Sequence, residues 1–342
     1  MEYAAIDLGR PFSWLCWLEK AVKSFRRLRL CKPELDRWFK NRAAMRVLIE
    51  SSTESEWVAQ HLESLGHEVV VADPNFEPMY GRKRKKIKTD KRDAEAMFEA
   101  NRAGLYHKAH RRSARGREMV RLLATRESLV RTRTRWINVC RTQLRALGFW
   151  MRSGSAETFF DRLADLELTQ EVRGHLSPFA VMWTPLNVQI ELLDKQVEQL
   201  GVNDSRVRVL QTMPTIGPMR SAAFVAVIDD ARRFRNAHQV GSYLGLVPSE
   251  WSSSDTERKG RITKAGDTRV RWLLIEAAWT ILCRPMLGCE ELRAWGQGIA
   301  ARRGKKIAVV ALARRIAGIL WAMMRDQSAF NPARLGHLPR VA

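Results

Sequence analysis

The sequence predicts an α/β fold at its start and mostly α-helical structure over the rest of the chain. In the first ~75 residues, five short apolar runs typical of strands are interspersed with two helical patterns. From residue 113 on, apolar residues recur at the spacing of one helix face. This order of elements is typical of a mixed sheet with helices on its faces, followed by helical regions.

The elements of the first part follow from local signals. We expect strands at 3–9, 13–20, 24–30, 45–51 and 67–74, and helices at 32–42 and from about 51 to 66. The run MRVLIES (45–51) is rich in branched residues and indicates a buried strand. Ser and Thr residues at 51–53 can cap the helix that follows, and Gly66 ends it. The predicted order is therefore β-β-β-α-β-α-β.

The middle of the chain predicts long helices. A helix at 90–102 precedes one at 113–148, whose apolar residues keep to one stripe. Eleven arginines fall between 111 and 145, against two glutamates. In a second segment, 186–200, the apolar residues follow a heptad spacing that predicts a coiled-coil seam: Leu186, Ile190, Leu193, Val197 and Leu200. The same pattern fits two core helices of one domain, so it allows dimerisation without requiring it.

The charge of the chain points to a polyanionic partner. The formal net charge is +22 and the isoelectric point is near 10.5. Nucleic acid is the leading candidate, because Lys and Arg that neutralise phosphates release counterions, and an anionic membrane surface is the weaker one. The densest basic run is expected to bind a phosphate backbone: Arg82, Lys83, Arg84, Lys85, Lys86 and Lys88.

The remaining composition predicts a protein of the bacterial cytoplasm, associated with the nucleoid. The five cysteines are scattered and form no CxxC pair, which favours neither a zinc ribbon nor a disulfide framework. The N-terminus is acidic and strand-like, unlike a signal peptide. The apolar stretch at 307–324 is interrupted by Arg314 and Arg315, so we expect an amphipathic helix and no membrane span.

Four carboxylates are candidates for a metal site. Asp7 and Glu50 stand at the ends of predicted strands, and Asp90 and Asp93 lie three residues apart on one face of a predicted helix. Clustered anions repel, and divalent cations such as Mg²⁺ would offset that repulsion. Two ions about 3.5–4 Å apart can act on a phosphodiester. Each acid alone is also explained as a helix cap, a helix-dipole partner or a turn residue.

Two further segments have the character of phosphate-binding sites. PTIGPMRSAAFVAVI resembles a helix-hairpin-helix in which Gly217 permits a tight turn, although an ordinary helical hairpin fits it as well. The segment 244–279 contains serines 249 and 252–254, followed by cations that include Arg258, Lys259, Arg261 and Lys264. A serine here is either a nucleophile toward phosphodiesters or part of a loop that only binds phosphate, and chemistry alone favours the loop.

Together these motifs resemble the insertion-sequence 110 family of transposases, the RNA-guided "bridge" recombinases related to the Piv and MooV invertases. AAIDLG, VLIESS and KTDKRDAEAM are similar to its RuvC-like, RNase H-fold domain with a DEDD acid set. MPTIGPMRSAAFVAVI and YLGLVPSEWSSSDTERKGRITKAGDTRVRW are similar to its transposase domain. The resemblance covers nearly the whole chain and implies domains at 1–110, 111–205 (the arginine-rich coiled-coil region) and 206–342.

The resemblance also implies a mechanism. Asp7, Glu50, Asp90 and Asp93 match the four metal-binding acids, with two Mg²⁺ ions expected. The family's nucleophilic serine lies five positions after the proline of GLxP, which is Ser253, although Ser254 replaces the glycine that usually follows it. Asp267 replaces the usual Asn after KxG. A serine–DNA covalent intermediate, guidance by a structured non-coding RNA, and a homo-oligomer (dimer or tetramer) acting on target and donor DNA are implied.

Two alternatives stay open at this stage. The first is a metal-dependent, structure-selective nuclease that uses water while the serine stays idle. The second is a non-catalytic nucleic-acid-binding protein in which the acids serve only as caps.

Overall fold

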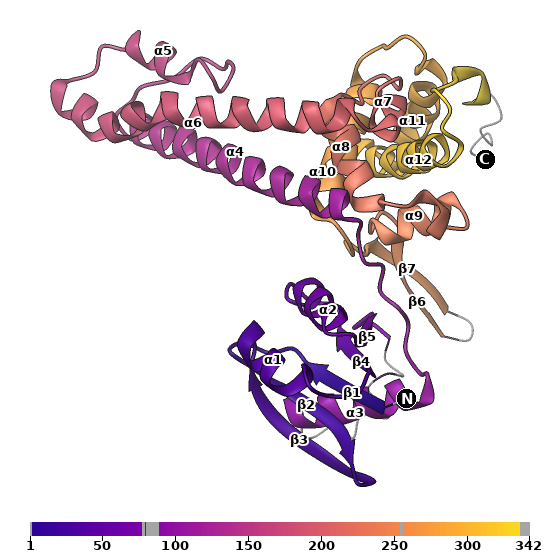
Figure 1. Ribbon diagram of the computed structural model, residues 1–342. Helices are drawn as coiled ribbons and strands as arrows, with labels where there is room; N and C mark the ends of the chain where they lie inside the picture. Colours follow the sequence, from indigo (N-terminus) through magenta and orange to yellow (C-terminus); the bar gives the residue numbers. More distant parts are fainter. Residues whose placement is uncertain (1, 77–78, 80–88, 254–255, 336–342) are drawn as a thin grey trace. The chain divides into compact units, whose positions relative to one another are not determined.

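A computed structural model describes residues 2–76, 79, 89–253 and 256–335, and the side chains at 251–259 are outside the described part. The chain divides into two compact units, Met1–Arg111 and Arg112–Ala342 (Figure 1). A boundary after residue 110 or 111 is common to this division and to the predicted domains. No division falls near residue 205, because the long helices of the middle region belong to the second unit.

The first unit is built on a five-stranded sheet. Its strands are β1 (Glu2–Asp7), β2 (Phe12–Glu19), β3 (Val22–Arg29), β4 (Met45–Glu50) and β5 (Glu68–Ala72), in the order β3-β2-β1-β4-β5. β1, β2 and β3 pair antiparallel, whereas β4 pairs parallel with both β1 and β5. The mixed sheet and the predicted order of elements are confirmed.

Helices cover both faces of this sheet, as predicted. The helices are α1 (Lys32–Phe39), α2 (Ser55–Ser64) and α3 (Asp90–Ala103). Alternate strand residues separate into two cores: one contains Ile6 and Ile49 with residues of α1 and α2, and the other contains Ala5 and Leu48 with residues of α3. The period of two in each strand therefore decides which side chains face α3.

α3 runs antiparallel to β1 and β4. The buried amide of Asn101, near its C-terminal end, donates to the carbonyl oxygens of Ala4 (2.8 Å) and Arg46 (3.0 Å), which lie toward the starts of β1 and β4. Farther toward the helix N-terminus, Lys91 lies 4.5 Å from the ring of Phe25 in β3. The helix therefore crosses the sheet from β3, near its first turn, to β1 and β4, near its last turn.

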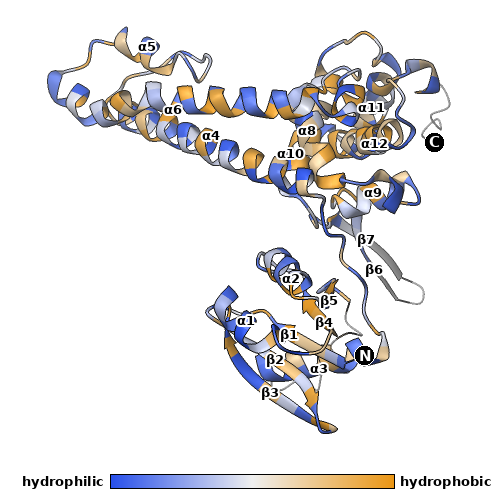
Figure 2. Cartoon of the chain, in the orientation of Figure 1, coloured by the Kyte–Doolittle hydropathy of each residue, from blue (hydrophilic) through white to orange (hydrophobic). Residues whose placement is uncertain are grey.

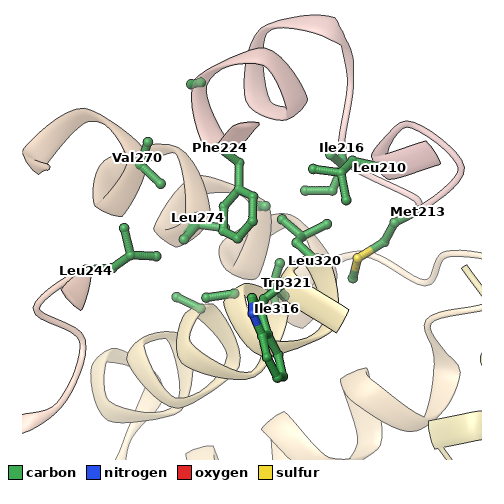
Figure 3. Packing of buried hydrophobic residues seen from close by; sticks show 14 of the residues in the cluster. Leu210, Met213, Ile216, Phe224, Leu244, Val270, Leu274, Ile316, Leu320 and Trp321 are labelled. Atoms are coloured by element: carbon green, nitrogen blue, oxygen red, sulfur yellow. The ribbon is translucent and has the colours of Figure 1, made fainter. Parts of the chain in front are cut away.

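The second unit combines two long helices with a helical core. Its elements are α4 (Ala114–Ala146), α5 (Phe159–Ala164), α6 (Gln170–Val202), α7 (Ser205–Leu210), α8 (Pro218–Ile228), η2 (Ala231–Arg233), α9 (Ala237–Tyr243), β6 (Pro248–Ser253), β7 (Thr256–Ile262), α10 (Thr268–Cys283), α11 (Glu290–Arg303), α12 (Lys305–Asp326) and η3 (Pro332–Leu335). α8 and α10 are largely hydrophobic (Figure 2). Phe224, Leu274 and Leu320 bring α8, α10 and α12 together in the core (Figure 3).

α4 and α6 form an antiparallel pair within one chain. Arg126 on α4 pairs with Asp194 on α6, and Arg133 on α4 donates to Asn187 on α6. A later residue of α4 therefore contacts an earlier residue of α6, as in an antiparallel pair. Leu186, Ile190 and Val197 of the predicted heptad are buried. In this chain the seam is therefore an intramolecular one, and it does not require a second copy.

Three features of the second unit differ from the sequence prediction. α6 begins at Gln170 rather than near 186, and it continues through Pro178 and Pro185. The Ser- and Lys-rich segment forms the antiparallel hairpin β6–β7 rather than a loop. The helices α9 and α11 were not anticipated. In each case the tertiary pairing of the segment outweighs its local composition.

α12 is long and apolar enough to cross a membrane by length and composition, but it packs as a core helix. In its most apolar stretch, 61% of the residues are buried inside the protein. Trp321 on this helix donates its indole N–H to the carbonyl of Ala231 at 2.8 Å. Arg314 and Arg315 interrupt the apolar sequence, and the predicted amphipathic helix at 307–324 is confirmed.

Replacing Asn101 by Ala should destabilise the protein. The buried carbonyl oxygens of Ala4 and Arg46 would each lose a donor, which costs about 1–3 kcal/mol of unfolding free energy. Urea unfolding of the full chain followed by circular dichroism measures this change. The exposed Asn41→Ala is the control and should change stability by less than about 0.5 kcal/mol. Equal effects of both substitutions would contradict the anchoring role of Asn101.

Candidate active site

Asp7 and Glu50 lie on the same face and at the same edge of the sheet. Each is the last residue of its strand, and the parallel register pairs Ile6 with Ile49 immediately before them. Asp7 follows Ala5 by two positions, and Glu50 follows Leu48 by two. Because Ala5 and Leu48 pack toward α3, the alternation of a strand places both carboxylates on the α3 side.

Asp90 and Asp93 extend the sheet-facing stripe of α3 toward the same edge. The buried residues Ala94, Met97 and Asn101 define this stripe, and Asp90 and Asp93 precede Ala94 and Met97 by four positions each. Asp93 is half-buried and Asp90 is exposed. Asp7 and Glu50 thus share one edge and one face of the sheet, and Asp90 and Asp93 lie in the first turn of the helix that covers this face.

The first turn of α3 decides between two readings of Asp90. The N-cap is Thr89, whose carbonyl accepts the backbone N–H groups of Arg92 (2.9 Å) and Asp93 (3.1 Å). Asp90 is therefore inside the helix rather than its N-cap. Both aspartates lie where the positive end of the helix dipole favours negative charge.

The donor chemistry of this edge fits a hard divalent cation. Mg²⁺ prefers carboxylate oxygens, keeps several waters and needs only one or two carboxylates per ion. Among the described residues, no three His, Cys, Asp or Glu side chains gather closely enough to enclose an ion. Asp7, Glu50 and Asp93 each have interactions within the protein. The edge thus offers carboxylate ligands without a closed ligand shell.

The predicted basic run before α3 is not described by the structure. Arg82, Lys83, Arg84, Lys85, Lys86 and Lys88 all lie outside the described residues. Their role in binding a phosphate backbone therefore stays a prediction.

The serine segment is a hairpin. Ser253 is the last residue of β6 and pairs with Thr256 of β7, while Ser249 donates its hydroxyl to the carbonyl of Arg261 at 3.0 Å. The side chains of Ser253, Arg258 and Lys259 are outside the described part, as is Ser254 entirely. Their catalytic and binding roles stay predictions.

Two glycines join the base of this hairpin to the core. A Cβ on Gly245 would lie 2.3 Å from the carbonyl oxygen of Ala265, and one on Gly266 would lie 2.0 Å from that of Tyr243. Both glycines also have φ in the left-handed region, +66° and +72°. The segments YLGL and TKAG therefore cross at backbone contact, which a side chain would prevent.

Arg271 stabilises the same backbone crossing by hydrogen bonds. It is only 8% exposed, and its guanidinium donates to the carbonyls of Leu244 (3.0 Å) and Ala265 (2.8 Å). Neighbouring Arg269 pairs with Glu127 of α4. Arg269 and Arg271 belong to the same basic segment, 244–279, but their guanidinium groups bind within the protein. Hydrogen bonding of this kind leaves no signal in a basic sequence. Arg261 and Lys264 are exposed, as phosphate contacts require.

Comparison with known proteins identifies the family. A family model for DEDD transposases of IS110 elements matches residues 4–148, and a model described as the IS116/IS110/IS902 transposase family matches 207–287. The transposase of IS1111A from Coxiella burnetii is 30% identical over 72% of this chain and 69% of its own length. The chain belongs to the IS110 family of transposases.

Two further relatives match the transposase over most of both chains. A probable family 20 transposase of Pseudomonas aeruginosa is 29% identical over 89% of this chain and 92% of its own. The transposase of the insertion sequence IS1328 from Yersinia enterocolitica is 26% identical over 95% and 97%. The protein is thus a DNA-cleaving and DNA-joining enzyme of an insertion sequence, which excludes the non-catalytic alternative.

The first matched region of the transposase contains Asp7, Glu50, Asp90 and Asp93, which we call the acidic edge. The second matched region contains α8 with Gly217. Gly217 is the N-cap of α8 and has φ of −80°, which any residue adopts. The left-handed residue of this turn is Thr215, with φ of +73°. The tight turn between α7 and α8 therefore does not depend on Gly217, contrary to the sequence interpretation. Asp267 caps α10 by accepting from Val270 N–H at 2.9 Å.

Replacing Gly266 by Ala should destabilise the transposase by at least about 2 kcal/mol, because the new Cβ meets a backbone oxygen in a left-handed conformation. Urea unfolding measures the loss. The control, Gly298→Ala in the exposed part of α11, has free space and should instead raise stability by about 0.5–1 kcal/mol. A neutral Gly266→Ala would refute the backbone contact.

Proposed function

We propose that this transposase cleaves DNA at a divalent-metal site formed by Asp7, Glu50, Asp90 and Asp93 in an RNase H-like domain. The observation that carries the proposal is that Asp7 and Glu50 share one edge and one face of the sheet, which is the face that α3 covers with Asp90 and Asp93 in its first turn. The strand order is β3-β2-β1-β4-β5, in which β2 pairs antiparallel with β1 and β3, and β4 pairs parallel with β1 and β5. This topology supports the RNase H-like assignment. Oxygen-only donors support Mg²⁺ as the ion.

Each part of the edge has a separate task in this proposal. Bound divalent ions would polarise the scissile phosphodiester and stabilise charge on the entering and leaving oxygens. Asp7 and Glu50 hold ligand positions on the rigid strand ends. Asp90 and Asp93 add carboxylates from a helix whose direction is fixed by the Asn101 anchor. The basic run that precedes Asp90 brings the phosphate backbone to this edge.

The second part of the proposal is a covalent step at Ser253. Its Oγ attacks phosphorus, a new Oγ–phosphorus bond forms, and the bond from phosphorus to one strand oxygen breaks. The hydroxyl proton passes to the departing oxygen, so that the cut strand remains joined to the protein until rejoining reverses the step. The family match over 207–287 and the position of Ser253 at the end of β6 support this role. The competing nuclease would use water.

We further propose a structured guide RNA and self-association as properties of this enzyme. The net charge of +22 supports binding of RNA as well as DNA. An exposed apolar row on α6 supports a homo-oligomer: Val181, Val188 and Leu192 are 72%, 47% and 45% exposed and recur at spacings of seven and four. This row is separate from the buried seam with α4. A dimer or tetramer would cover it.

Asp93→Asn should abolish metal-dependent cleavage. We expect excision of an element, carried on a plasmid with its own flanking DNA, to fall by about 100-fold or more. Binding of Mn²⁺ to the purified protein, followed by electron paramagnetic resonance, should weaken in parallel. The control is Glu95→Gln on the same helix, which loses only a surface contact of 2.9 Å with Lys23. Unchanged Mn²⁺ binding in Asp93→Asn would refute the metal site.

Ser253→Ala should remove the covalent protein–DNA adduct seen on a denaturing gel, while Ser252→Ala retains it. Cleavage without any adduct in the unchanged protein would establish the nuclease alternative. An adduct lost in Ser254→Ala but kept in Ser253→Ala would assign the nucleophile to the neighbouring serine and refute Ser253.

A further inference from the structure

A cavity separate from the acidic edge and the serine hairpin lies among the last helices of the second unit. Its volume is about 580 Å³, and it is lined by residues of α9, α11, α12 and the segment that follows α12. On α12 the small residues Ala311 and Ala322 line it, whereas α9 packs closely against Gly318 through Ala237. Volumes of this order are typical of sites for small organic ligands.

Two cations of this cavity have no counter-charge among the residues that the structure describes. Arg314 and Arg315 line it, and neither guanidinium has a hydrogen bond or ion pair with another described residue. Arg315 is half-buried, and desolvation lowers its pKa, with no acidic neighbour to offset the effect. The desolvation penalty of such a charge is offset when a bound ligand supplies an anion.

The acid that lines the cavity is already neutralised. Both oxygens of Asp326 accept from Arg325, at 2.7 and 3.0 Å. Arg334 also lines the cavity and, after Arg325, helps to lower the pKa of the Asp326 carboxyl. Phosphate and carboxylate groups are therefore the chemistry that these guanidinium groups would recognise.

The rest of the wall is apolar and partly aromatic. Trp295 of α11 and Phe330 both line the cavity and are half-buried, so part of each ring is accessible. Phe330 is held in place because its backbone N–H donates to the hydroxyl of Thr212 at 2.8 Å. Aromatic rings of this kind stack on nucleobases, and stacking tolerates any base.

We propose that this cavity is a binding site for a nucleoside phosphate, with the phosphate on Arg314 and Arg315 and the base against Trp295 and Phe330. The nucleotide comes either from solution or from the phosphorylated end of a nucleic acid strand. Inorganic phosphate alone leaves the aromatic wall unused, and a nucleoside alone leaves the cations unpaired. The site goes beyond DNA cleavage and does not depend on the acidic edge.

Isothermal titration calorimetry of the full chain in EDTA tests the proposal, because it needs neither metal nor strand cleavage. Deoxyadenosine 5′-monophosphate should bind at least 10-fold more tightly than deoxyadenosine or inorganic phosphate. Arg315→Gln should weaken its binding ~10- to 100-fold, as loss of a charged hydrogen bond predicts. Ala322→Leu, which fills the cavity without changing charge, should weaken binding by a similar factor.

The matched control is Arg303→Gln, which removes an exposed arginine at the end of α11 that does not line the cavity. It should leave the affinity within about twofold. Equal weakening by Arg303→Gln and Arg315→Gln, or absence of saturable mononucleotide binding, would overturn the proposal. Circular dichroism checks that each variant is folded. If Ala322→Leu is unfolded, the result for Arg315→Gln alone tests the proposal.

A competition arm distinguishes the two sources of the nucleotide. A 5′-phosphorylated tetranucleotide that displaces the mononucleotide, when its 5′-hydroxyl form does not, supports capture of a strand end. Failure of both tetranucleotides to compete, with mononucleotide binding intact, supports a free nucleotide. Either result supports the nucleoside phosphate site. Equal competition by both forms would show that the 5′-phosphate is not recognised and would overturn the proposal.

Discussion

The geometry of the first unit depends on the two-residue period of its parallel strands. Because β1 and β4 pair in register, residues 7 and 50 reach the same height, and because both lie two positions after α3-facing residues, they share a face. A slip of one residue in either strand would send one carboxylate to the opposite face. The acidic edge is thus a consequence of sheet register, which the buried apolar residues on both faces enforce.

The same constraint sets an electrostatic problem that the fold partly solves. Acids held near one another repel, and this repulsion opposes the fold that gathers them. The first turn of α3 offsets some of it, since its unpaired N–H groups favour nearby negative charge by ~0.3–1 kcal/mol for each acid. The helix-dipole and metal-ligand readings of Asp90 and Asp93 are therefore compatible.

In the second unit the corresponding constraint is a backbone crossing. Gly245 and Gly266 let two segments touch where no side chain fits, and Arg271 satisfies two carbonyls beside the contact. These glycines belong to the segments GLVP (245–248) and KAG (264–266), which flank the serine hairpin. Their physical role is to hold the hairpin. Between them, β6 and β7 project the serine segment from the core on a rigid base.

The sequence predicts those parts of the structure whose interactions leave a pattern in the order of residue types. The strands and helices of the first unit were predicted within a few residues, because apolar periodicity reports burial directly. α6 was predicted only from 186 because Pro178 and Pro185 mimic helix stops. The hairpin β6–β7 was missed because its ladder is built from backbone groups under polar side chains. Strand ends located Asp7 and Glu50, whereas nothing in a basic run separates buried Arg271 from exposed Arg261.

The arginines of α4 show why net charge alone is a poor map of the nucleic-acid surface. Arg115, Arg126 and Arg133 pair with acids that lie after α4 in the chain, and thereby fasten the long helix to its neighbours: Asp204, Asp194 and Glu157. Arg121 and Arg135 are exposed, and their guanidinium groups have no partner among the described residues. Charges that are already paired release few counterions on binding DNA or RNA. On α4, the charge available to a phosphate backbone is therefore concentrated at the residues that the fold leaves unpaired.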